Sequence, residues 1–266
     1  MSTPTALTIA GSDSSGGAGI QADLKTFAAL SVYGASVLTA LTAQNTRGVT
    51  GVHLVPPDFV TAQIDAVFDD LAVGAVKIGM VAQASIADAI AASLARWRPA
   101  HIVLDPVMVA TSGARLLPED AIEALRSRLV PQASLITPNL PEAAALLGEP
   151  VAGTDADIEA QGRRLLALGC PAVLIKGGHG QGAESTDYLI TSGACLALPA
   201  PRVATKNTHG TGCSLSSAVA AGLAKGESLE TAVRNAKAFI SGAIAAADRF
   251  TVGHGHGPVH HLYRFY

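Results

Sequence analysis

Short apolar runs alternate with longer amphipathic segments along most of the 266-residue chain. Several runs are apolar at nearly every position, as in strands buried on both faces; they predict strands at residues 6–10, 35–43, 75–78, 101–104, 134–137 and 172–176. The segments between them repeat apolar residues at helical spacing and predict helices at residues 20–30, 59–70, 85–96, 118–129, 140–147 and 157–168. This alternation predicts an α/β fold with a mainly parallel central sheet, flanked by helices on both faces.

The pattern changes in the last third of the chain. Two apolar runs, 188–191 and 195–198, flank Ser192-Gly193 and predict a hairpin. Two long amphipathic helices follow. The apolar stripe of the first is Leu215, Ala218, Val219, Gly222 and Leu223, and that of the second is Leu229, Ala232, Val233, Ala236, Phe239, Ile240, Ala243 and Ile244. Without an internal repeat or a separating linker, residues 1–266 are predicted to form a single domain.

Composition narrows the class of protein. Hydrophobic residues make up 49% of the chain and charged residues only 15%, so a large core is available. The net charge of −3 and the absence of a Lys/Arg run argue against nucleic acid or an anionic membrane as partner, and no apolar stretch approaches a membrane span of roughly 18 residues. Cys170, Cys195 and Cys213 are odd in number and lack CxxC spacing, so we expect a reducing, cytoplasmic setting.

The segment Thr208-His209-Gly210-Thr211-Gly212-Cys213, called the glycine turn below, opens the first long helix. Its two glycines allow consecutive N–H groups to converge, and the helix N-terminus adds partial positive charge, which suits a phosphoryl group. Cys213 lies in the first helical turn, where the pKa of a thiol is commonly lowered. A Gly-rich helix start with a merely buried Cys remains the alternative.

Two further segments follow strands near the N-terminus. Residues 11–19 (GSDSSGGAG) join the first strand to the first helix, a place where open α/β sheets bind ligands, although neither GxGxxG nor a P-loop occurs. A flexible turn with Asp13 as an N-cap is the alternative. Gln44 and Asn45 follow the second strand; an amide offers a donor beside an acceptor, which matches a ring nitrogen next to an amino group, but polar residues are common at strand ends.

Charged or amide side chains lie at or just after the ends of three other predicted strands. Asp105 comes after a buried strand, where a carboxylate is well placed to bind magnesium. Asn139 and Glu142 begin the helix after the next strand, and ordinary helix capping explains this pair equally well. Lys176 ends a strand before a Gly-rich turn and can neutralise phosphate charge.

A Gly-rich segment near the C-terminus carries four histidines: His254, His256, His260 and His261. Metal binding there is disfavoured, because the segment holds no carboxylate or Cys and lies far in sequence from the magnesium candidates.

Several long motifs occur in order along nearly the whole chain. They are AGSDSSGGAGIQADLKT (10–26), TAQNTRG (42–48), KIGM (77–80), DPVMVATSG (105–113), TPNLPE (137–142), KGGH (176–179) and HGTGCSLS (209–216). In these motifs the chain resembles the hydroxymethylpyrimidine/phosphomethylpyrimidine kinases of the ribokinase-like superfamily. The resemblance implies an ATP- and Mg²⁺-dependent homodimer that phosphorylates an aminopyrimidine alcohol and then its monophosphate for thiamine synthesis.

The resemblance also implies roles for individual residues. The substrate-binding set is Gly11, Asp23, Gln44, Met80 and Val107. The nucleotide-binding set is Asn139, Glu142, Lys176 and Thr208, with magnesium at Asp105 and Glu142. The catalytic set is Lys176 with Gly210, Thr211, Gly212 and Cys213.

Two positions depart from the family pattern. Ser15 replaces a Gly of the form SDSGGGAG, and Thr111 stands where Lys is frequent, which leaves Lys176 as the main cation. The nearest alternative function is a pyridoxal-type kinase of the same fold. A non-catalytic sensor of pyrimidine or nucleotide is a more distant one, since no second module is evident.

Overall fold

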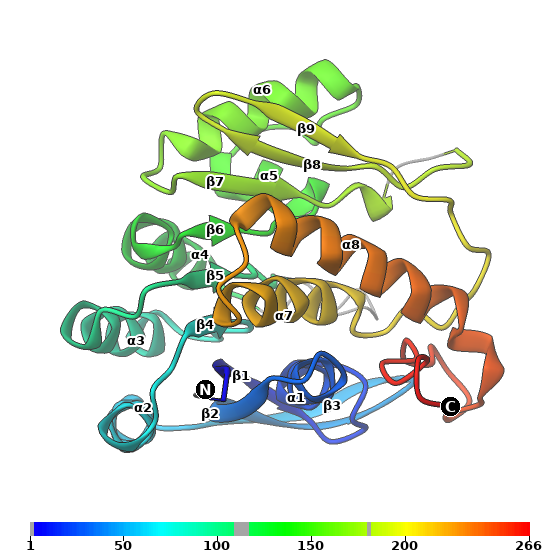
Figure 1. The fold of residues 1–266 in the computed structure, drawn as a ribbon. Helices are drawn as coiled ribbons and strands as arrows, with labels where there is room; N and C mark the ends of the chain where they lie inside the picture. Colours follow the sequence, from blue (N-terminus) through cyan, green and yellow to red (C-terminus); the bar gives the residue numbers. More distant parts are fainter. Residues whose placement is uncertain (1–2, 109–116, 180–181) are drawn as a thin grey trace.

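The computed structural model describes residues 3–108, 117–179 and 182–266, and these residues form one nine-stranded sheet (Figure 1). The strand order is β3-β2-β1-β4-β5-β6-β7-β8-β9. The strands are β1 (Thr5–Asp13), β2 (Tyr33–Asn45), β3 (Gly48–Leu54), β4 (Ala75–Ile78), β5 (Ile102–Leu104), β6 (Leu135–Ile136), β7 (Ala172–Ile175), β8 (Asp187–Thr191) and β9 (Cys195–Leu198). The six strands from β2 to β7 are parallel, whereas β3, β8 and β9 join antiparallel at the two edges.

Helices cover both faces of the sheet (Figure 1). One layer contains α1 (Gly19–Ala29), α7 (Thr211–Ala224) and α8 (Leu229–Ala245). The other contains α2 (Pro57–Asp70), α3 (Ala84–Trp97), α4 (Glu119–Ala124), α5 (Leu140–Leu147) and α6 (Asp155–Leu166). The predicted α/β architecture is therefore confirmed.

The two-sided burial follows from the period-2 geometry of the strands. In β1, Leu7 and Ile9 pack into the core under α2 and α3, whereas Ala6 packs toward α1, α7 and α8. In β5, Leu104 likewise packs into the first of these cores and Val103 into the second. Because both faces are apolar, these strands appear in the sequence as continuous apolar runs.

Apart from shifts of up to three residues at the ends of other elements, the structure differs from the predicted elements in three places. β2 is longer than predicted and pairs with β3, which the sequence analysis missed because β3 is largely exposed and has no apolar run. The predicted helix 118–129 is α4 followed by a π-helical turn, Leu125–Leu129. β7 ends at Ile175, so Lys176 lies just beyond the strand. No helix in the described ranges is long and apolar enough to span a bilayer.

Candidate active site

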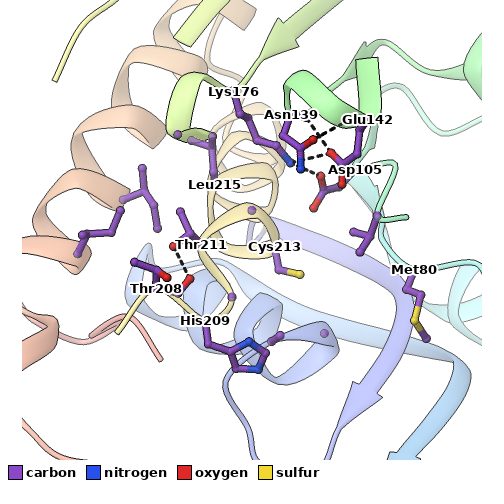
Figure 2. A pocket seen from close by; sticks show the side chains of 18 of the residues that line it. Met80, Asp105, Asn139, Glu142, Lys176, Thr208, His209, Thr211, Cys213 and Leu215 are labelled. Carbon is purple, nitrogen blue, oxygen red and sulfur yellow. Dashed lines mark hydrogen bonds and ion pairs between the residues drawn. The ribbon is translucent and has the colours of Figure 1, made fainter. Parts of the chain in front are cut away.

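A cavity of about 690 Å³ lies at the carboxyl ends of the parallel strands. Asp105 follows β5, Asn139 follows β6 and Lys176 follows β7, so parallel pairing alone brings their side chains together. Figure 2 shows these residues grouped with Glu142 on one side of the pocket, with the Cys213 side chain and Met80 each lying apart from that group. The volume suits a small-molecule ligand.

The glycine turn closes the cavity from the α7 side. Gly210 is the N-cap of α7 with φ +80°, and a Cβ at this position would collide with the carbonyl oxygen of Gly17. The Thr211 N–H bonds to the Thr208 carbonyl at 3.2 Å, and the first bond within the helix runs from the Ser214 N–H to the Gly210 carbonyl at 2.9 Å. The N–H groups of the intervening residues, Gly212 and Cys213, have no acceptor within the described residues, and both residues line the cavity. They form a site that suits an anion.

The thiol of Cys213 is protonated at neutral pH. Burial raises its pKa to about 11. The Lys77 ammonium and the Gly19 N–H oppose this increase, whereas the Asp23 and Asp105 carboxylates reinforce it. The expectation of a lowered thiol pKa at this helix start is therefore wrong, because burial and two nearby carboxylates outweigh the Lys77 ammonium and the Gly19 N–H.

Lys176 lies between two carboxylates. Its Nζ is 2.7 Å from Asp105 Oδ1 and 3.6 Å from Glu142 Oε2. Burial lowers the pKa of Lys176, but the two carboxylates raise it by more, so the ammonium persists. Burial and the Asp105 carboxylate raise the pKa of Glu142 against the opposing effect of Lys176.

Asn139 and Glu142 have two structural roles at once. The Glu142 N–H donates to Asn139 Oδ1 at 2.9 Å, and the Asn139 N–H donates to Glu142 Oε2 at 2.7 Å, which forms a capping box at the start of α5. The capping interpretation is therefore correct. Both residues also line the cavity, so the cap fixes the Glu142 carboxylate in place beside Lys176.

The acidic pair fits a divalent cation bound with a nucleotide. Asp105 and Glu142 already converge on one cationic atom, Lys176 Nζ. Magnesium is generally bound by one or two carboxylates together with phosphate oxygens and water. Within the described residues no group of three or more His, Cys, Asp or Glu is arranged to hold a metal, so phosphate oxygens would have to complete the coordination.

The opposite end of the cavity is formed by the last residues of β1 and β2 and by residues that follow β4 and β5. Gly11, Gln44, Met80 and Val107 all line it, together with Thr208 at the glycine turn. A Cβ at Gly11 would clash with the Met80 side chain, so glycine allows the methionine to approach β1 closely. The structure thus brings these predicted residues into the same cavity as Lys176 and Cys213.

Asp23 does not reach the cavity. Its side chain is fully buried and bonds to Lys77, Thr8 and Ser217 beneath the pocket floor. The expectation that it holds polar groups of the substrate does not fit this placement, because every one of these bonds lies within the protein.

The two positions that depart from the family pattern are Thr111 and Ser15. Thr111 lies outside the described residues. Ser15 donates from its N–H and Oγ to Asp13 Oδ1 at 2.8 and 2.7 Å.

Sequence reasoning missed several residues that line the cavity. Asp13 was considered only as a helix N-cap, and His209 only within a motif; in the structure Asp13 Oδ2 lies 2.8 Å from His209 Nε2. Lys77, within KIGM, lies under the glycine turn. Lys237, on α8, bonds to Asp187 at 2.9 Å, and no motif marked either residue.

The C-terminal histidines divide between surface and core. His260 and His261 are buried, and His261 Nε2 lies 2.8 Å from Ser214 Oγ in the first turn of α7. The Val259 N–H donates to the His209 carbonyl, and the His209 N–H donates to the Gly257 carbonyl. The tail therefore packs directly against the glycine turn.

These features define a class of protein: an α/β kinase of the ribokinase-like fold, with an anion site at a helix start and an acidic pair beside a lysine, both lining one cavity. The phosphomethylpyrimidine kinase family matches residues 13–260. The chain belongs to the hydroxymethylpyrimidine/phosphomethylpyrimidine kinases.

Individual relatives support this family membership. The chain is 55% identical over 266 residues to hydroxymethylpyrimidine/phosphomethylpyrimidine kinase of Escherichia coli (strain K12), covering 100% of both chains. Its fold matches phosphomethylpyrimidine kinase of Clostridium difficile 630, with TM-score 0.81, 44% identity and coverage of 90% and 99%. It also matches an ADP complex of Bacillus subtilis pyridoxal kinase, with TM-score 0.92, 37% identity and 100% of both chains covered. The pyridoxal kinase match supports the alternative function only at the level of fold.

Proposed function

We propose that this kinase uses Mg-ATP to phosphorylate 4-amino-5-hydroxymethyl-2-methylpyrimidine and then its monophosphate, which yields the diphosphate needed for thiamine biosynthesis. The carrying observation is that Gln44, Cys213 and Lys176 line one cavity around the glycine turn. An acceptor held at Gln44 and a nucleotide held at Lys176 therefore face each other across Cys213.

Each group of residues has a role that follows from its position in the cavity. Gln44 contacts the edge of the ring, while Gly11, Met80 and Val107 surround its faces. Lys176 and the N–H groups of Gly212 and Cys213 stabilise charge on the migrating phosphoryl group. Asn139, Glu142 and Thr208 lie toward the nucleotide, and Asp105 with Glu142 would hold magnesium, which supplies further neutralisation of phosphate charge.

Phosphoryl transfer needs little help from a base here. The alcohol oxygen forms the new bond to the γ-phosphorus while the bond from phosphorus to the leaving ADP oxygen breaks. Because the Cys213 thiol is neutral, it cannot remove the alcohol proton beforehand. The proton passes to an oxygen of the transferred phosphoryl group as the new bond forms, and Cys213 orients the hydroxyl group.

An ADP-release assay tests the function. The wild-type enzyme is supplied with the pyrimidine alcohol, its monophosphate or pyridoxine, in parallel. We expect turnover of the first two and a much lower kcat/KM for pyridoxine. Turnover of pyridoxine alone would support the pyridoxal-type alternative, and no ADP from any alcohol would support the sensor.

Cys213→Ala tests the arrangement of the site. We expect kcat to fall far more than substrate affinity, because the thiol lies beside the acceptor oxygen. An unchanged kcat would remove Cys213 from the chemistry.

We also propose that the enzyme is a cytoplasmic homodimer. All three cysteines are free thiols, which fits a reducing compartment. β3 is an exposed strand at the sheet edge next to the long β2, and such an edge can pair with another chain. Light scattering would give the mass of the assembly, and a proline at Val52 would dissociate a dimer formed along this edge. Cell fractionation would test the compartment.

A further inference from the structure

His209 joins the phosphate-binding and ring-binding ends of the cavity. It lies directly before Gly210 of the glycine turn, and its side chain extends away from Lys176 (Figure 2). His209 Nε2 is 2.8 Å from Asp13 Oδ2 and 3.3 Å from Gln44 Nε2. His209 and Asp13 are buried, so their contacts are shielded from water.

Asp13 determines which atom of His209 carries the hydrogen. Burial opposes ionisation of Asp13, but hydrogen bonds from His209 and Ser15 hold the pKa of this carboxyl well below its ordinary value. The carboxylate also accepts from the backbone N–H groups of Gly17 and Ala18 at 3.1 and 2.8 Å. An ionised carboxylate can only accept, so His209 Nε2 must carry a hydrogen and donate it to Asp13.

This hydrogen limits the orientation of the Gln44 amide. A protonated Nε2 cannot accept from the Gln44 side-chain nitrogen, so those two donors would face each other at 3.3 Å. Turning the amide by half a turn places Oε1 against His209 and the NH₂ group against Thr42 Oγ1, 3.0 Å from the amide. Thr42 Oγ1 can accept there, because its own hydrogen goes to the Ser12 carbonyl at 2.8 Å. This orientation removes the contact between two donors and gives one N–H of Gln44 an acceptor.

We propose that His209, held by Asp13, is a positioning residue that fixes the orientation of the Gln44 amide. It thereby determines which edge of the substrate ring faces Gln44. The proposal rests on the proposed function, since it assumes that Gln44 contacts the ring. An amide presents its donor on one side and its acceptor on the other, so reversing it reverses the ring edge that it matches. Reversing the ring also changes the direction in which its hydroxymethyl group points relative to Cys213.

His209→Met tests the proposal, because Met fills similar space without a donor. We expect kcat/KM for the aminopyrimidine to fall about tenfold, mainly through KM, and the preference over pyridoxine to shrink by a similar factor. His209→Gln, whose amide can still donate to Asp13, should restore most of the preference. In a Gln44→Leu background, His209→Met should change the preference less than about twofold, since the residue through which it acts is gone.

The controls separate positioning from general damage. His261→Gln alters another buried histidine that contacts the first turn of α7 without touching Gln44, and the substrate preference should stay unchanged. If His209→Met does not fold, Asp13→Asn provides a second test. Its amide can donate to Nε2, so the hydrogen is no longer fixed there and the preference should again shrink.

Two outcomes would overturn the proposal. One is an equal loss of kcat/KM for both substrates with His209→Met. The other is the same loss with and without Gln44. Failure of the proposed function is a different result, because wild-type enzyme would then turn over no aminopyrimidine.

Discussion

Lys77 Nζ lies 2.9 Å from both carboxylate oxygens of Asp23, and both side chains are completely buried between the sheet and helices α1 and α7. Asp23 also accepts from Thr8 Oγ1 at 2.6 Å and from Ser217 Oγ at 2.7 Å. Burial alone would lower the pKa of Lys77, but Asp23, Cys213 and Asp105 together raise it by more. A fixed positive charge therefore lies under Cys213, four residues before Ser217 on the same face of α7.

Asp23→Leu should destabilise the protein by about 3–5 kcal/mol, because it leaves the Lys77 charge buried without a partner. Urea denaturation followed by circular dichroism measures the change. The double variant Asp23→Leu/Lys77→Met should recover most of the loss, since it removes both charges. A loss below about 1 kcal/mol for the single variant would mean that water or another group compensates Lys77.

The Cys213 thiol should react slowly with iodoacetamide at neutral pH. Its pKa of about 11 lies above the ordinary thiol value, so the thiolate fraction, and with it the rate, should rise only as the pH approaches 11. The measurement uses a Cys170→Ala/Cys195→Ala variant, in which Cys213 is the single thiol. A rate that levels off near pH 7 would show that Cys213 is a thiolate at neutral pH and would contradict its raised pKa.

Lys176→Met should lower kcat about 10²–10³-fold, because one charge that stabilises the transferring phosphoryl group is lost. Steady-state ADP release at saturating ATP measures it. Lys225→Met is the matched control: this lysine lies just after α7, away from the cavity, and kcat should not change. Equal kcat values for the two variants would remove Lys176 from the chemistry.

Gly210→Ala should abolish most activity, whereas Gly226→Ala should not. Both glycines have positive φ, +80° and +83°, so alanine is strained at each. Only at Gly210 would the new Cβ also meet a carbonyl oxygen, that of Gly17, and displace the glycine turn. Parallel measurements of kcat and urea stability separate the effects. Matching losses of activity in the two variants would show that backbone strain alone matters.

His261 should make the protein less stable as the pH falls from about 6.5 to 4. Burial, Lys25 and His260 lower its folded-state pKa to about 4, so over this interval the unfolded chain binds a proton that the folded chain excludes. The cost should reach about 3 kcal/mol near pH 4. Stability curves of wild type and His261→Gln should converge as the pH is lowered; parallel curves would show that His261 does not carry this dependence.

Local chemistry made much of this molecule predictable. Strands buried on both faces have to be apolar throughout, so β1, β4, β5 and β7 were evident as short runs. Because β5, β6 and β7 are parallel, their carboxyl ends bring Asp105, Asn139 and Lys176 together. The ends of the predicted strands therefore identified this part of the site. β3 could not be found in this way, because an exposed edge strand needs no apolar pattern.

The tertiary structure alone decided how polar groups pair across the chain. Asp23 was assigned to the substrate from its motif, yet packing against Lys77 and Ser217 buries it. The thiol pKa of Cys213 depends on Lys77, Asp23 and Asp105, none of which is near it in sequence. Sequence thus determined the parallel strands and the polar residues at their carboxyl ends, because strands buried on both faces have a local apolar pattern. Burial and long-range charge determined protonation and side-chain orientation, because they depend on which distant residues the fold brings within a few ångströms.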